Sequence, residues 1–191
     1  MRTLLTRAAL LAGLAVVPAA GVAQGMGGIP HHEVGVDVQL GLLSPSGGST
    51  HVQLFTPVDV RLGFVSSSAL SWEGRLTLAW DSKGFGSNSS YSIAPDIQAL
   101  LKLGKGSGNH GLMGPYATAG VGLTFLDEPN GTGGTNSSAV FRLNGGIGDR
   151  LPWEAGALRI EGFVGYDFKN TTLGIPGTLE VGARVGLSLW H

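Results

Sequence analysis

Cysteine is absent from the 191 residues, so no disulfide framework stabilises the fold. The 12 basic and 13 acidic residues nearly balance, which gives none of the strong positive charge typical of nucleic-acid-binding proteins. Beyond residue 23, no apolar run approaches the ~18 residues that a membrane-spanning helix needs, and no segment has helical periodicity. Without helices or disulfides, the fold must be built mainly from strands.

The N-terminus has the three parts of a cleavable secretory signal. Arg2 and Arg7 form a basic start, "AALLAGLAVV" is a short apolar run, and "GVAQ" offers a small-x-small cleavage site after Ala23. An uncleaved anchor is the alternative, but the apolar run is too short to span a bilayer. We therefore expect a signal peptide over residues 1–23, a flexible periplasmic lead over 24–32 and a single domain over 33–191.

The rest of the chain alternates apolar and polar residues, the period of strands with two different faces. The predicted strands cover residues 33–43, 51–64, 69–81, 91–103, 112–126, 139–149, 157–168 and 178–191. Within them, fifteen charged residues share the polar phase and one, Asp149, has the apolar phase. The links after the first, third, fifth and seventh strands are richer in Ser, Thr and Asn than the others. This pattern predicts an eight-stranded antiparallel meander closed into a barrel.

Alternation alone does not decide which face meets water, because a soluble lipocalin-like barrel has the same period. Eleven glycines of the predicted strands share the polar phase and three the apolar phase. Small residues suit the crowded interior of an eight-stranded barrel. The polar face carries Arg, Asp and Glu but only one lysine, Lys102, and a confined interior favours arginine because its planar fork pairs with carboxylates. We therefore expect the polar face to line the lumen and the apolar face to meet lipid.

Aromatic residues near the strand ends support the same orientation. The predicted girdles contain Trp80, Tyr91, Phe125 and Phe168 at the outer side, and Phe64 and Trp72 at the periplasmic side. Such girdles mark the two membrane interfaces, although aromatics are also enriched in strands generally.

Polar-phase charges are predicted to pair across the lumen. The candidate lumen network consists of Asp59, Arg61, Glu73, Arg75, Arg142, Arg159, Glu161, Glu180 and Arg184. One register of the second and third strands would set Arg61 opposite Glu73 and Asp59 opposite Arg75; one of the last two strands would set Glu161 opposite Arg184. The simpler interpretation is that these charges pair and rigidify the lumen; the alternative is a gate or ion path.

Three motifs that point to other chemistry lack the context they need. "GSGNHG" at 106–111 matches a dinucleotide-binding fingerprint, but no strand–helix unit surrounds it. His31 and His32 are adjacent, but no third metal ligand is evident, so we expect neither a metal nor another cofactor. His51 lies close to Ser49 and Thr50 without a compact His–Ser–acid constellation, so we expect no catalytic residues and no enzyme.

The signal peptide, the eight amphipathic strands and segments such as "GPYATAGVGLTF" and "LRIEGFVGYDF" resemble the small outer-membrane β-barrel proteins of Gram-negative bacteria. The transmembrane domain of outer membrane protein A and its OmpX-, OmpW- and attachment-locus-like relatives are the most similar in form. That family usually ends in an aromatic residue that helps the assembly machinery recognise the chain, whereas here Trp190 precedes a terminal His191.

The resemblance implies an eight-stranded up-and-down barrel in the cell outer membrane, with both termini in the periplasm. Its partners would be outer-membrane lipid and, during biogenesis, periplasmic chaperones and the barrel-assembly machinery, with no nucleic acid. We expect a non-enzymatic structural or surface-presenting role. A narrow channel for small or hydrophobic solutes is the first alternative; a lipid-modifying enzyme and a soluble ligand-binding barrel remain open.

Overall fold

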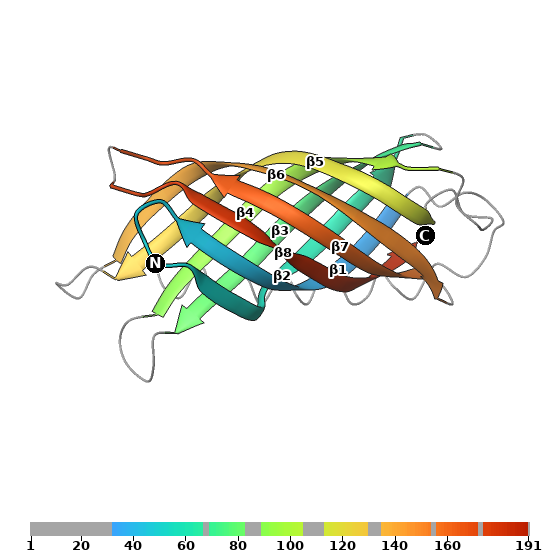
Figure 1. The fold of residues 1–191 in the computed structure, drawn as a ribbon. Coiled ribbons are helices and arrows are strands. Elements are labelled where there is room, and N and C mark those ends of the chain that lie inside the picture. The colour runs from blue at the N-terminus through green and yellow to red at the C-terminus, as the bar shows by residue number, and fades with distance from the viewer. Residues whose placement is uncertain are drawn as a thin grey trace.

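The computed structural model describes residues 32–66, 69–82, 89–104, 113–129, 135–153, 156–171 and 174–190. The described residues form eight strands that close into one antiparallel barrel, in which each strand pairs with its neighbours in the chain and β8 pairs with β1 (Figure 1). The strands are β1 His32–Pro45, β2 His51–Val65, β3 Leu70–Ser82, β4 Ser89–Lys102, β5 Gly114–Pro129, β6 Thr135–Trp153, β7 Gly156–Asp167 and β8 Thr178–Trp190. The predicted all-β, up-and-down barrel is confirmed.

Strand boundaries differ from the prediction mainly at β6. This strand was predicted over 139–149 and extends from Thr135 to Trp153. "TNSS" at its start has no apolar alternation, and "RLPW" at its end contains a proline, so neither segment has a clear strand signal. The predicted signal peptide, the 106–111 motif, His31 and His191 lie outside the described residues.

Closure of the barrel is made by a continuous ladder between the first and last strands. It runs from Glu33 opposite Trp190 to Pro45 opposite Thr178. Closure leaves no unpaired sheet edge along this seam, which is the condition for a sheet in an apolar solvent. The strands tilt across the long axis of the barrel (Figure 1), and with 12 to 19 residues each they exceed the ~9–11 residues that a transmembrane strand needs.

Two local features follow from the sequence. The β4–β5 ladder is interrupted at Ala94 and Pro95, because proline has no N–H to donate. The turn after β1 contains Gly47 at φ 81°, a backbone conformation that favours glycine.

The barrel is polar inside and apolar outside. In β8 the apolar residues from Leu179 to Leu189 are exposed, whereas Glu180, Arg184 and Ser188 are buried. Every strand contributes large exposed apolar side chains, and Ile147 reaches 68% exposure. Phe64, Trp72, Phe125 and Phe168 are exposed on this outer face, as predicted for the girdles. Trp80 and Tyr91 are opposite each other in the β3–β4 ladder, but their side chains lie outside the described part of the structure.

Trp190 differs from the aromatic residues of the predicted girdles. It is buried, with 7% of its surface exposed, and it packs with Met113 and Ala157 inside one end of the barrel. An inward tryptophan at this position leaves the outward phase at the end of β8 to Leu189.

Candidate functional site in the barrel lumen

The lumen is filled by an ionic network whose side chains come from six neighbouring strands, β6, β7, β8, β1, β2 and β3. All nine residues predicted for the lumen are buried, and each makes at least one ion pair. They lie in β2 (Asp59, Arg61), β3 (Glu73, Arg75), β6 (Arg142), β7 (Arg159, Glu161) and β8 (Glu180, Arg184). Seven of them join one connected cluster, while Arg142 pairs separately with Glu180 and with Asp167 near the other end of the barrel.

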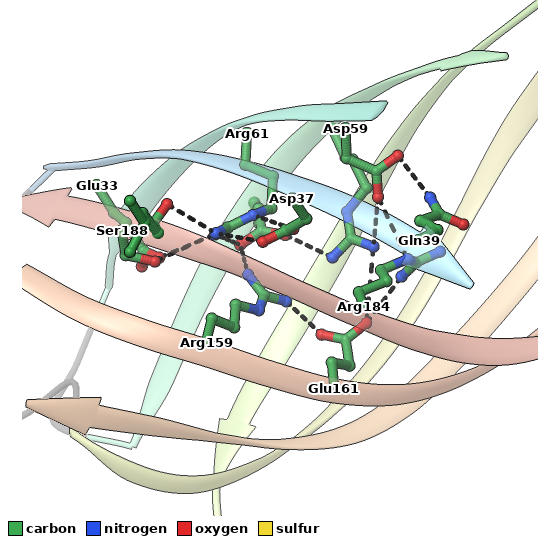
Figure 2. A network of polar contacts seen from close by, with 12 residues as sticks. Glu33, Asp37, Gln39, Asp59, Arg61, Arg159, Glu161, Arg184 and Ser188 are labelled. Atoms are coloured by element: carbon green, nitrogen blue, oxygen red, sulfur yellow. Dashed lines mark hydrogen bonds and ion pairs between the residues drawn. The ribbon is translucent and has the colours of Figure 1, made fainter. Parts of the chain in front are cut away.

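Arg61 is one centre of the connected cluster. Its guanidinium lies 3.0 Å from Glu33, 2.5 Å from Asp37 and 3.2 Å from Glu73, and it also donates a hydrogen bond to Ser188 Oγ at 3.2 Å (Figure 2). The opposing backbone makes room for it, since a Cβ at Gly35 would lie only 2.4 Å from Arg61 Nη2. The arginine therefore lies flat against strand β1.

Glu73 is the second centre, on the neighbouring strand. It accepts hydrogen bonds from Arg61, from Arg75 at 2.8 Å and from Arg159 at 2.6 Å. A carboxylate has about four lone-pair sites, and three guanidinium groups occupy them without leaving a bare charge.

A third part of the cluster centres on Asp59 and Glu161. Asp59 pairs with Arg75 at 3.4 Å and with Arg184 at 3.2 Å, and accepts a hydrogen bond from Gln39 at 2.7 Å. Glu161 pairs with Arg184 at 2.8 Å and also with Arg159 (Figure 2). The predicted position of Glu161 opposite Arg184 is confirmed by the β7–β8 ladder.

The predicted register of β2 and β3 is wrong by two residues. The ladder sets Arg61 opposite Arg75 and Gly63 opposite Glu73, and the turn closes one residue later than expected, with Ser66 N–H bonded to Leu70 O. A slip of two residues keeps every side chain on its own face, so alternation cannot detect it. The like charges tolerate this register because carboxylates bridge them: Arg61 still pairs with Glu73, and Arg75 with Asp59, along diagonals.

Sequence reasoning missed several members of the network. Glu33 and Asp37 have the polar phase of β1 but were not selected, and Arg150 lay just beyond the predicted end of its strand. Arg150 pairs with Glu33 at 2.7 Å. The continuing even-numbered phase from Arg142 to Arg150 was a signal that could have identified it.

Tyr116 was also missed as a partner. Its hydroxyl donates to Glu161 at 3.0 Å and accepts from Arg159 Nε at 2.6 Å. The guanidinium carbons of Arg150 and Arg159 lie 5.1 Å and 4.9 Å from the centre of its ring. The tyrosine thus connects β5 to the charged side of the lumen.

The connected cluster is balanced in charge. In the described residues it contains five carboxylates (Glu33, Asp37, Asp59, Glu73, Glu161) and five arginines (Arg61, Arg75, Arg150, Arg159, Arg184). Burying a charge is costly unless it is paired, so each ion depends on its neighbours. Such an arrangement fixes the positions of the strands that supply it.

No group of three or more His, Cys, Asp or Glu side chains in the described residues could hold a metal ion. His32 packs edge-on against Phe64, with ring centres 5.4 Å apart. The side chain of His51 lies outside the described part.

No helix in the described part of the chain is long and apolar enough to cross a membrane.

Comparison with known proteins shows similarity of structure only. No protein-family model matches the chain, and no curated protein matches its sequence. Neisserial surface protein A matches with a TM-score of 0.60 and 14% identity, over 84% of this chain and 97% of that one. Ail, the attachment invasion locus protein of Yersinia pestis, matches with a TM-score of 0.56 and 8% identity, over 85% and 100%. The N-terminal β-barrel domain of OprF from Pseudomonas aeruginosa matches with a TM-score of 0.50 and 11% identity, over 81% and 97%.

At these identities the matches show the fold. The chain has the fold of the small eight-stranded outer-membrane β-barrels.

Proposed function

We propose that this chain is an integral protein of the bacterial outer membrane with a structural, non-enzymatic role. It would support the envelope or present the loops that follow β1, β3, β5 and β7 at the cell surface. Both ends of the barrel domain would then face the periplasm. Outer-membrane lipid would be its solvent, and periplasmic chaperones and the assembly machinery would be its partners during biogenesis.

The observation that carries this proposal is the inverted distribution of polarity. The outer surface displays apolar side chains from all eight strands of the described residues, while arginines and carboxylates fill the interior. Monomeric soluble proteins rarely expose contiguous apolar patches larger than a few hundred Å². A belt around a whole barrel far exceeds that limit, and lipid is the environment in which it is stable.

The packed lumen supports a structural role over a channel. Arg61 reaches from β2 to carboxylates on β1 and β3, and Arg159 reaches from β7 to Glu73 on β3. Chains of ion pairs therefore cross the interior from one wall to the other. An eight-stranded barrel has an interior just wide enough for its side chains, so these contacts favour a plugged lumen over an open channel.

Two measurements test the proposal. We expect the mature protein to fractionate with the outer membrane, and to migrate faster on a detergent gel before heating than after it. Release with the soluble periplasmic proteins would contradict the location. In a planar bilayer we expect no steady conductance; regular single-channel steps would replace the structural role with the channel alternative.

A further inference from the structure

One wall of the lumen is unlike the charged side. Asp96 and Gln98 on β4, Thr118 on β5 and Asn144 on β6 are each at least nine-tenths buried. Their polar atoms Asp96 Oδ1, Gln98 Oε1 and Nε2, Thr118 Oγ1, and Asn144 Oδ1 and Nδ2 have no hydrogen-bond partner. These unsatisfied groups lie on three adjacent strands and face the lumen.

The ladders bring Asp96, Gln98 and Asn144 to neighbouring levels, whereas Thr118 is opposite Leu100 and Gly146, four residues along β5 from the position opposite Asp96. Gln98, Gly120 and Asn144 are directly opposite one another across β4, β5 and β6. A Cβ at Gly120 would lie 2.5 Å from Gln98 Cγ and 2.7 Å from Asn144 Oδ1, so both side chains lie over the bare glycine. A Cβ at Gly122 would lie 2.6 Å from Asp96 Cβ, which places Asp96 beside the same strand one step along.

Asp96 is the exception among the buried carboxylates of the lumen. Among the described residues, seven carboxylates and six arginines are buried: Glu33, Asp37, Asp59, Glu73, Asp96, Glu161 and Glu180, against Arg61, Arg75, Arg142, Arg150, Arg159 and Arg184. Six of these carboxylates form ion pairs with arginine, and within the described part Asp96 forms none. Among these thirteen buried groups one negative charge is therefore in excess, and Arg75, opposite Asp96 in the β3–β4 ladder, already pairs with Asp59, Glu73 and Glu161.

We propose that Asp96, Gln98 and Asn144 bind one small monovalent metal cation, sodium or potassium, inside the barrel. A buried carboxylate without an ion pair is costly, and a single positive charge balances it. The side-chain oxygens of Gln98 and Asn144 are hard ligands of the kind that such ions prefer over nitrogen or sulfur. A single carboxylate with neutral oxygens matches a charge of one better than a charge of two.

Direct binding is measured by the ²³Na NMR line width of the purified, folded barrel in detergent. We expect the wild-type protein to broaden the sodium signal, and potassium to reverse part of the broadening by competition. Asp96→Asn removes the charge with almost no change in shape and should abolish the excess broadening. Asp149→Asn is the matched control, because Asp149 lies on β6 in the outward phase; it should leave the broadening unchanged.

A second variant protects the test from a folding defect. Asn144→Ala keeps the charge and removes one oxygen ligand, so the sodium concentration needed for half-maximal effect should rise. Heat-modifiable migration verifies that each variant is folded. Equal broadening by wild type and Asp96→Asn would overturn the proposal. So would an infrared band of a protonated carboxylic acid that disappears in Asp96→Asn, since a proton would then neutralise the charge.

Discussion

At the scale of single residues, packing in the lumen depends on complementary charges and on glycines, which leave space for large side chains. Arg61 contacts three carboxylates, and it fits because Gly35 has no Cβ. A buried ion pair is not by itself a large gain in stability, because both ions lose their hydration. The loss of one partner is the expensive event, because it leaves an uncompensated charge.

Removing the charge of Arg61 should therefore be costly. We expect Arg61→Met to lower the free energy of unfolding by about 3–5 kcal/mol, because Asp37 would be left without an ion-pair partner. Urea unfolding in lipid vesicles measures this. A double-mutant cycle with Glu73→Gln should give a coupling energy of roughly 0.5–3 kcal/mol. Additive effects of the two substitutions would show that Arg61 and Glu73 do not interact.

Gly35 gives a prediction with a close control. In Gly35→Ala the added methyl would lie 2.4 Å from Arg61 Nη2, so the guanidinium must move away from its partners. We expect a loss of about 1–3 kcal/mol, the usual cost of overpacking. Gly74→Ala is the control, since its Cβ would have Leu62 O at 3.9 Å as its neighbour. A similar loss in both variants would mean that strand propensity, not space for Arg61, decides the effect.

At the scale of strands, alternation located all eight elements and their two faces, because the side-chain period of a strand is visible in the sequence. Which residues pair across β2 and β3 was not visible, since a two-residue slip preserves both faces. Arg150 was missed for a related reason, because the proline at 152 obscured the end of β6. Gln39 and Arg184 could be identified as partners of Asp59 only from the closed barrel, because closure brings β1, β2 and β8 together.

Disulfide cross-linking can test the register of β2 and β3. The absence of cysteine lets two be introduced without background. We expect the pair Leu62→Cys and Gly74→Cys to form a disulfide in the folded barrel, because these positions are opposite in the ladder. The pair Leu62→Cys and Trp72→Cys, which would be opposite in the register predicted from the sequence, should oxidise far more slowly. The reverse order of rates would restore the register predicted from the sequence.

The C-terminal end of β8 leads to a prediction about assembly into the outer membrane. Trp190 is inward, and in the sequence His191 continues the odd-numbered phase of the apolar residues from Leu179 to Leu189. We expect His191→Phe to leave assembly unharmed or to improve it, because an apolar ring suits an outward position at the lipid boundary. The amount of heat-modifiable protein in the outer membrane reports the result. A clear loss of folded barrel would contradict this role for the terminal residue.

At the scale of the whole molecule, the barrel reverses the usual arrangement of a soluble protein. Its apolar residues form the outer surface, and its charged residues form the core. The sequence indicated this through glycine and arginine on the polar phase, because an interior with little space needs small residues and compact ion pairs. The wall of Asp96, Gln98 and Asn144 was not foreseen, since its members become neighbours only across three strands.

The depth of a charge on the outer surface should determine its cost. Val121 lies near the middle of β5 and is 50% exposed. We expect Val121→Arg to destabilise the protein in vesicles by roughly 2–4 kcal/mol, the cost of arginine near the bilayer midplane. Leu151→Arg, close to the end of β6, should cost about 0–1 kcal/mol. Equal and small costs at both positions would mean that water, not lipid, covers the outer face.

The most direct test of the central claim is the environment of each face of β8. Single nitroxide labels at Val181, Ala183, Val185 and Leu187, compared with labels that replace the large inward side chains of Glu180 and Arg184, can be measured in lipid vesicles by electron paramagnetic resonance. We expect high accessibility to oxygen, which concentrates in lipid, at the four odd-numbered positions, and low accessibility to both oxygen and a water-soluble nickel reagent at the two lumen positions. High accessibility of the odd-numbered positions to the nickel reagent would show that the apolar face meets water, and would contradict a membrane-spanning barrel.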